Sequence, residues 1–127
     1  MTNRPIPAAS GPRLLAGLLL LAGMMVGCQA DFGADITNRT PQPVFATIFR
    51  KGGSEAVAGA SRRLGPGDRA FVGTVRTRKD HGAFISVYTM GNPDGPVTAD
   101  LPPGESYLEI QQDGQGPSSP IRIVEKR

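Results

Sequence analysis

Short stretches in which apolar side chains occupy every second position recur from residue 34 onward, and clusters of Gly, Pro, Asn and Asp separate them. A two-residue period is typical of β-strands with one buried face, and the separating residues are typical of turns. No stretch after residue 30 has the period of a helix. The pattern therefore predicts seven or eight strands, in residues 34–38, 44–50, 56–64, 69–76, 83–90, 97–101, 106–111 and 120–126.

The stretch at residues 44–50 (VFATIFR) is largely apolar on both of its faces. One face carries Val44, Ala46 and Ile48, and the other carries Phe45, Thr47 and Phe49. A strand with one solvated face alternates apolar with polar residues, whereas a strand covered on both faces does not. We therefore expect this stretch to be a central strand.

Two five-residue segments, 64–68 (LGPGD) and 101–105 (LPPGE), share the pattern Leu, any residue, Pro, Gly, acid. Pro presets φ near −65°, and Gly supplies the positive φ that a type II turn needs at its third position. The Leu is expected to fill the core beside each turn. The repeat indicates two similar turns, with an ancestral duplication or a pair of binding loops as the alternatives.

The spacing of the strands, about eight to twelve residues, is typical of a β-sandwich or a small barrel. The pattern resembles immunoglobulin-like and transthyretin-like sandwiches in architecture only. With one Cys and no Trp, the chain lacks the Cys, Trp, Cys set of true immunoglobulin domains. The expected fold is all-β, a single small antiparallel β-sandwich of seven or eight strands over residues 34–127, preceded by a cleaved signal helix.

The first residues have the composition of a signal peptide. Residues 1–13 contain Arg4 and Arg13 but no acid, and the thirteen residues 14–26 are uncharged and mostly apolar. Thirteen helical residues reach about 20 Å, which is short of the hydrocarbon core of about 30 Å. The run is therefore not expected to be a permanent membrane span.

The apolar run ends in Met25, Val26, Gly27 and Cys28, and Cys28 is the only Cys of the chain. These residues resemble the lipobox of bacterial lipoproteins, in which small residues precede the Cys. The resemblance covers residues 1–30. It implies cleavage of the signal peptide between Gly27 and Cys28, and attachment of lipid, including acyl chains such as palmitate, at Cys28. Because Gln29 is not the Asp that often retains lipoproteins at the inner membrane, it also implies anchoring at the outer membrane, facing the periplasm.

The resemblance divides the chain into three parts. Residues 1–27 are the signal peptide, residues 28–33 are the lipidated N-terminus with a short tether, and residues 34–127 are the β-sandwich domain. A tether of five residues spans at most about 17 Å, so the domain is expected close to the bilayer. The alternative is that Cys28 is an ordinary small residue in a leader that is cut elsewhere, for instance after Ala30.

The sequence has fourteen Lys and Arg residues against eleven Asp and Glu, a formal charge of +3. Arg4 and Arg13 belong to the leader, so twelve bases and eleven acids remain in the mature part, a charge of +1. Global charge therefore does not predict a nucleic-acid-binding protein.

Six of the twelve remaining bases fall within eighteen residues: Arg62, Arg63, Arg69, Arg76, Arg78 and Lys79. If the strands at 56–64 and 69–76 pair, these residues form one cationic face. Such a face is a candidate binding face for lipid headgroups, an anionic glycan or an acidic protein. The alternative is a solvated edge whose charges keep strands from aggregating.

Few residues point to catalysis. His81 is the only imidazole and lies in a turn, so no metal site and no cofactor are expected. The carboxylates show no pair at a catalytic spacing, and no nucleophile elbow, phosphate-binding loop or dinucleotide-binding motif occurs. The glycosylation sequon at residues 38–40 is expected to be accidental. An enzyme that uses the scattered carboxylates is a third hypothesis, which their convergence in a pocket would favour.

The expected function is that of a lipid-anchored, non-enzymatic β-sandwich that acts as a binding or structural module in the bacterial envelope. Its partners would be the membrane, through Cys28, and an envelope protein or an anionic glycan or lipid, but not nucleic acid. The alternative is an accessory or inhibitory subunit of an envelope complex that engages its partner by strand addition.

Overall fold

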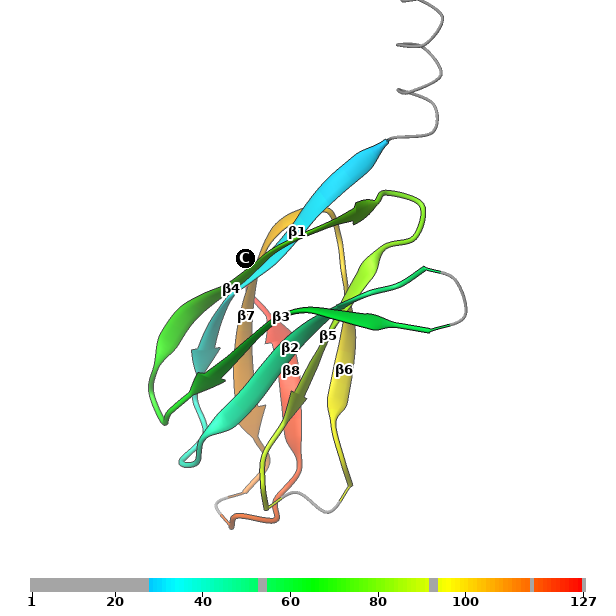
Figure 1. Cartoon of the computed structure of the whole chain (residues 1–127). Coiled ribbons are helices and arrows are strands. Elements are labelled where there is room, and N and C mark those ends of the chain that lie inside the picture. The colour runs from blue at the N-terminus through cyan, green and yellow to red at the C-terminus, as the bar shows by residue number, and fades with distance from the viewer. Residues whose placement is uncertain (1–27, 53–54, 92–93, 115, 127) are drawn as a thin grey trace, which may run out of the picture.

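The computed structural model (Figure 1) describes residues 28–52, 55–91, 94–114 and 116–126. The predicted signal peptide, with Gly27 before its cleavage site, lies outside the described residues. The described residues form an all-β structure, and their secondary structure contains strands and turns but no helix. Within them, no helix is therefore long and apolar enough to span a membrane.

All eight predicted segments contain a strand. The strands are β1 (Gln29–Asn38), β2 (Val44–Arg50), β3 (Val57–Leu64), β4 (Arg69–Arg78), β5 (Ala83–Tyr88), β6 (Val97–Leu101), β7 (Gly104–Gln112) and β8 (Ile121–Glu125). They form two four-stranded sheets, in the orders β4-β1-β7-β8 and β3-β2-β5-β6. The expected central strand at residues 44–50 is β2, which lies between β3 and β5, so that prediction is confirmed.

The inward side chains of both sheets form one core. Phe32, Ile36 and Ile110 come from one sheet and Ile48 and Ile85 from the other, and each is at most 1% exposed. Burying a side chain of this size stabilises the fold by about 1.5–3 kcal/mol. The two-layer arrangement is sandwich-like, and it leaves the outer face of each sheet to solvent.

The prediction of a tether at residues 28–33 is wrong, because β1 begins at Gln29. Phe32 is 1% exposed and belongs to the core. Asp31 is bound by Arg76 of β4, with 2.8 Å between carboxylate and guanidinium. Small residues around Phe32 give a weak strand signal in the sequence, whereas pairing with β4 and burial of Phe32 make the segment a strand.

The prediction of a purely antiparallel fold is wrong for one pair of strands. β1 and β7 are parallel, with Phe32 opposite Gly104 and Asn38 opposite Ile110. The other pairings are antiparallel. The period of a strand carries no information on the direction of its neighbour, because parallel and antiparallel strands both alternate their side chains.

The two Leu-Pro-Gly segments both carry the chain from the β3-β2-β5-β6 sheet to the other sheet. In the first, the Asp68 amide donates to the Gly65 carbonyl at 3.0 Å, and Gly67 has a φ of 80°. Pro66 and Gly67 thus occupy the positions that a type II turn assigns to them. Leu64 and Leu101 are buried beside their turns, as predicted.

Asn38, at the end of β1, holds the first of these turns in place. Its side-chain amide donates to the carbonyls of Gln42, Leu64 and Gly65 at 2.8–3.1 Å. Its side-chain oxygen accepts from the Thr40 amide and hydroxyl. Because Asn38 is 0% exposed, the sequon at residues 38–40 is inaccessible in the folded chain.

The strands define two ends of the molecule. At one end, which we call the Cys28 end, the Lys79 amide donates to the Cys28 carbonyl at 3.0 Å, and the Lys51 amide to the Gly82 carbonyl at 3.0 Å. The loops after β1, β3, β5 and β7 lie at the opposite end, which we call the far end. In Figure 1 the start of β1 and the β4–β5 turn are at the top, and these four loops are in the lower half.

Candidate binding site

The six basic residues of the predicted cationic face do not lie on one sheet. Arg62 and Arg63 lie on β3, whereas Arg69 and Arg76 lie on β4. β3 and β4 are edge strands of different sheets, so the pairing on which that face depended does not occur. The turn at residues 65–68 passes the chain to the other sheet, and this is why consecutive strands are not hydrogen-bonded neighbours.

Three of these six bases form ion pairs. The pairs are Arg69–Asp35 at 2.8 Å, Arg76–Asp31 at 2.8 Å and Arg78–Asp80 at 3.1 Å. The guanidinium groups of Arg69 and Arg76 each donate two hydrogen bonds to their carboxylate. Within the described part of the chain, Arg62, Arg63 and Lys79 have no ion pair, so these residues retain their charge for an outside partner.

Four hydroxyl side chains stand in register across the outer face of the β3-β2-β5-β6 sheet. We call them the hydroxyl row: Ser61, Thr47, Ser86 and Thr98, one from each strand. The Thr47 and Ser61 hydroxyls are hydrogen-bonded to each other at 3.0 Å. The row spans about 14 Å, because neighbouring strands are about 4.8 Å apart.

A pair of stacked rings flanks the hydroxyl row on each side. Phe45 of β2 and Tyr88 of β5 have centroids 5.0 Å apart, and Phe49 and Phe84 have centroids 5.2 Å apart. Tyr88 is 40% exposed, and the three Phe side chains are half-buried. Outward aromatic residues on a solvated sheet face are unusual and are typical of interaction surfaces.

A hollow with a volume of about 300 Å³ opens where the hydroxyl row meets β3. We call it the Arg63 hollow, and its lining is Phe45, Ala46, Thr47, Ser61, Arg62, Arg63 and Tyr88. Arg63 stands directly opposite Phe45 in the strand register, and Phe45 stands opposite Tyr88. Arg62 stands opposite the buried Ala46, so its side chain points to the other face of β3. The hollow therefore combines the Arg63 guanidinium, two hydroxyls and two rings at the far end of the sheet.

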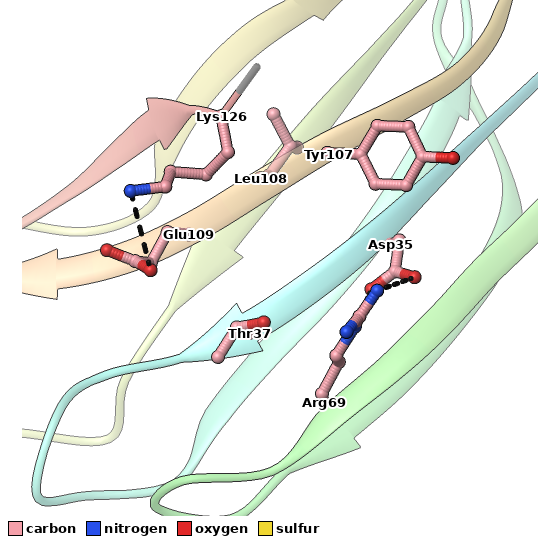
Figure 2. Close-up of a pocket in the computed structure, with 7 residues that line it drawn as sticks. All are labelled: Asp35, Thr37, Arg69, Tyr107, Leu108, Glu109 and Lys126. Atoms are coloured by element: carbon pink, nitrogen blue, oxygen red, sulfur yellow. Dashed lines mark hydrogen bonds and ion pairs between the residues drawn. The ribbon is translucent and has the colours of Figure 1, made fainter.

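A second hollow, of about 380 Å³, lies on the outer face of the other sheet and is shown in Figure 2. We call it the Tyr107 hollow, and its lining is Asp35, Thr37, Arg69, Tyr107, Leu108, Glu109 and Lys126. Asp35 and Arg69 face each other, and the Lys126 ammonium points to Glu109 at 3.9 Å (Figure 2). Glu109 also accepts from Arg39 at 3.2 Å. The charged side chains of the Tyr107 hollow are therefore paired with one another or with Arg39.

The two carboxylates of the Tyr107 hollow are both held in the ionised form. The hydrogen bonds from Arg69 lower the pKa of Asp35 below its ordinary value. The hydrogen bond from Gln111 is the main cause that lowers the pKa of Glu109, and Arg39 and Lys126 add to it. A general acid needs a raised pKa, so these carboxylates are suited to ion pairing rather than to proton donation at neutral pH.

The residues with metal-binding or nucleophilic side chains are spread out. Cys28 is exposed just before β1, and His81 lies in the β4–β5 turn beside Gly52. Among the described residues, no group of three or more His, Cys, Asp or Glu side chains is placed to hold a metal ion.

The residues that build the Arg63 hollow besides its arginines were not singled out from the sequence, yet a signal is present. Phe45, Thr47 and Phe49 follow an aromatic, hydroxyl, aromatic pattern at every second position. Residues 84–88 repeat it as Phe, Ser and Tyr. Two such matching patterns on one outer face are expected to align when their strands pair. The sequence alone does not show that these two strands pair with each other.

Comparisons with known proteins add no further assignment, because no family model, no curated protein and no solved structure matches the chain.

Proposed function

We propose that the protein is a lipid-anchored, non-enzymatic binding module of the bacterial envelope, built as an immunoglobulin-like β-sandwich. Its partner binds at the Arg63 hollow, and Cys28 attaches the chain to the outer membrane. The observation that carries the binding role is the hollow itself, in which Arg63 lies beside two hydroxyls and two rings. A binding site needs a concave surface with a few convergent polar groups, and this hollow has both.

The position of Cys28 supports the anchor. Cys28 is exposed, and the first strand begins at the next residue. An acyl chain on this thiol would therefore extend into the bilayer without displacing the core. The Arg63 hollow lies toward the other end of the strands, so the anchored protein would present it away from the membrane.

The ion pairing in the Tyr107 hollow supports a non-enzymatic role. Asp35 and Glu109 converge there, which is the arrangement that a carboxylate enzyme requires. Both are tied to bases, however, and neither has the raised pKa of a general acid.

The anchor is tested by the intact mass of the protein purified from membranes. The expected result is a lipid-sized increment on the chain that begins at Cys28, absent from a Cys28→Ala variant. An unmodified Cys28 would contradict the anchor.

The binding role is tested by cosedimentation with isolated envelope fragments. The Cys28→Ala variant is produced without residues 1–27, so that neither lipid nor the apolar leader holds the protein to the pellet. We expect it to cosediment, and the double variant Cys28→Ala, Arg63→Gln to remain mostly in solution. Equal cosedimentation of the two variants would contradict binding through the Arg63 hollow.

A second candidate function is an accessory subunit that engages its partner by strand addition. The edge strands β6 and β8 favour it, because each pairs with its neighbour in unbroken register. The edges formed by β3 and β4 contain register shifts, which discourage added strands. A stoichiometric protein that crosslinks from position 98 on β6, and not from position 61 on β3, would support this function.

A further inference from the structure

The charge at the Arg63 hollow is not satisfied within the described part of the chain. The Arg63 side chain has no hydrogen bond or ion pair there, whereas other arginines bind carboxylates. The bound ones are Arg39, Arg69, Arg76, Arg78 and Arg122. A guanidinium group binds a carboxylate through two parallel hydrogen bonds. The hollow is therefore complementary to a ligand that carries carboxylates.

The hydroxyl row extends the hollow into a polar strip. Ser61 and Thr47 line the hollow, and Ser86 and Thr98 continue the row to the opposite edge of the sheet. A hydroxyl both donates and accepts, so it pairs with another hydroxyl in either direction. A strip of about 14 Å with hydroxyls about 4.8 Å apart suits an extended polymer rich in hydroxyls.

The rings limit what else the site accepts. Phe45 and Tyr88 provide an apolar wall against which the carbon face of a sugar ring can pack. A volume of about 300 Å³ is at the lower limit of small-molecule sites, so the hollow holds a small unit rather than a folded segment. An apolar peptide anchor would meet the Arg63 guanidinium and two hydroxyls, which it would leave without partners.

The position of the hollow separates it from the membrane. Arg63 and Tyr88 lie opposite Phe45, which is one residue from the far end of β2. β2 spans about 20 Å from Val44 to Arg50, and Arg50 is next to the Cys28 end. The headgroups of a membrane that holds Cys28 would therefore lie at the wrong end for this site.

We propose that the Arg63 hollow and the hydroxyl row bind an acidic polysaccharide, a sugar polymer that carries carboxylates. Arg63 binds a carboxylate, the row binds sugar hydroxyls, and the rings pack against a sugar unit. This inference rests on the proposed function, because it names the ligand class of the same site.

The test is an NMR titration of the ¹⁵N-labelled full-length chain in detergent micelles. The probe is hexagalacturonate, and its methyl ester serves as the matched ligand without charge. We expect amide shifts at Thr47, Ser61, Arg63 and Tyr88 with the acid, and binding at least tenfold weaker with the ester. Added salt is expected to weaken the binding of the acid.

Two variants test the assignment of the residues. Arg63→Gln is expected to weaken hexagalacturonate binding at least tenfold. Arg50→Gln removes the same charge near the Cys28 end and is expected to change binding less than twofold. Thr47→Val keeps the shape of the hydroxyl row while removing one hydroxyl, and it is expected to weaken binding several-fold. Unchanged amide shifts elsewhere confirm that each variant is folded.

The outcomes are decisive in both directions. Equal binding of acid and ester, or equal effects of Arg63→Gln and Arg50→Gln, would overturn the proposal. Binding of hexaglutamate or of phosphatidylglycerol vesicles at the same residues, but not of hexagalacturonate, would assign the site to an acidic protein or to lipid instead. If hexagalacturonate does not bind but cosedimentation still depends on Arg63, only the polysaccharide is refuted. If cosedimentation is independent of Arg63 as well, the proposed function is refuted.

Discussion

Asn38 shows how one buried polar side chain organises a loop region. It makes five hydrogen bonds, three as a donor to backbone carbonyls and two as an acceptor from Thr40. The carbonyls belong to Gln42, Leu64 and Gly65, so one side chain ties the end of β1 to the turn that leads into β4. Buried polar groups cost free energy unless they are paired, and here each partner satisfies the other.

Replacing Asn38 by Ala is expected to lower the free energy of unfolding by roughly 2–4 kcal/mol, because it leaves buried carbonyls without donors. Urea denaturation followed by circular dichroism measures the change. Gln29→Ala, which removes an exposed amide at the start of β1, is the control and should change stability by less than about 0.5 kcal/mol. A similar small effect at Asn38 would contradict the network.

The ion pairs of β1 with β4 make stability depend on pH. Hydrogen bonds from Arg76 and Arg69 are the main causes that lower the pKa values of Asp31 and Asp35. In the unfolded chain these carboxyl groups have a pKa of about 3.9. Because the folded pKa values lie below this, the pairs contribute stability above about pH 4 and lose it as the pH falls through the folded values.

An Asp35→Asn variant is therefore expected to have a flatter stability curve than the unmodified protein between pH 5 and pH 2. The Asp31 side chain is 48% exposed and the Asp35 side chain 19%, while both arginines are about two-thirds exposed, so the effect is expected to be small and to shrink at high salt. Carboxyl ¹³C chemical shifts measured against pH give the pKa values directly. Values of Asp31 and Asp35 at or above about 3.9 would rule out this contribution.

Because β1 begins at Gln29, the residues that follow Cys28 belong to the folded domain. From the sequence they predict a tether, but they form the first half of a central strand between β4 and β7. Ala and Gly next to Phe32 give weak strand propensity, and long-range pairing outweighs it. A one-residue bulge accompanies the pairing, since Gly33 alone stands between Phe32 and Ala34, while two residues of β4 lie opposite.

The two interpretations of this segment differ in their prediction for Phe32→Ala. If the segment is a strand, the variant loses a fully buried ring and about 3–5 kcal/mol of stability. If it is a tether, the variant is neutral. Phe71→Ala is the matched control, because Phe71 is 41% exposed on the outer face of β4 and should cost clearly less. Equal urea midpoints for Phe32→Ala and the unmodified protein would contradict the assigned strand.

The connection between β3 and β4 determines on which sheets the clustered basic residues lie. A hairpin turn would have joined Arg62 and Arg63 with Arg69 and Arg76 in one sheet. The type II turn at residues 65–68 instead passes the chain to the opposite layer, and Asn38 holds it there. Residues close in the sequence thus point to different surfaces. The turn itself is predictable from Pro66 and Gly67, but the layer that it leads to is not.

The described domain has two structurally distinct ends. Cys28 and the β4–β5 turn share one end, and the loops after β1, β3, β5 and β7 share the other (Figure 1). The ten residues of β1 run about 30 Å between them. If Cys28 carries lipid, no flexible segment separates the described domain from the bilayer, so the domain has a defined orientation.

This orientation is measurable with the lipidated protein in vesicles that contain a nitroxide-labelled headgroup. We expect the amide signals of Lys79 and His81 to broaden and those of Gly67 and Asp68 to stay sharp. The Cys28→Ala form mixed with the same vesicles is the control and should show no broadening. Equal broadening at both ends would mean that the domain does not stand on its Cys28 end.

Much of this protein is encoded locally. A strand in each of the eight predicted segments, the type II turn at residues 65–68, the buried Leu64 and Leu101 and the central place of β2 follow from periods and turn residues, because these depend on neighbours within a few positions. The match to a lipobox is also local, and it remains a prediction. A local pattern shows how apolar and polar side chains alternate along one strand, and this alternation is the same whichever strand pairs with it.

The partners of each strand are not local. The parallel pairing of β1 with β7, the separation of β3 from β4 and the register that aligns the hydroxyl row join residues far apart in the chain. Such pairings form only when both inner faces close on one core, since that burial supplies the free energy that orders the chain. The six clustered bases were visible in the sequence, but only the folded sheets placed Arg63 beside Phe45 and Tyr88.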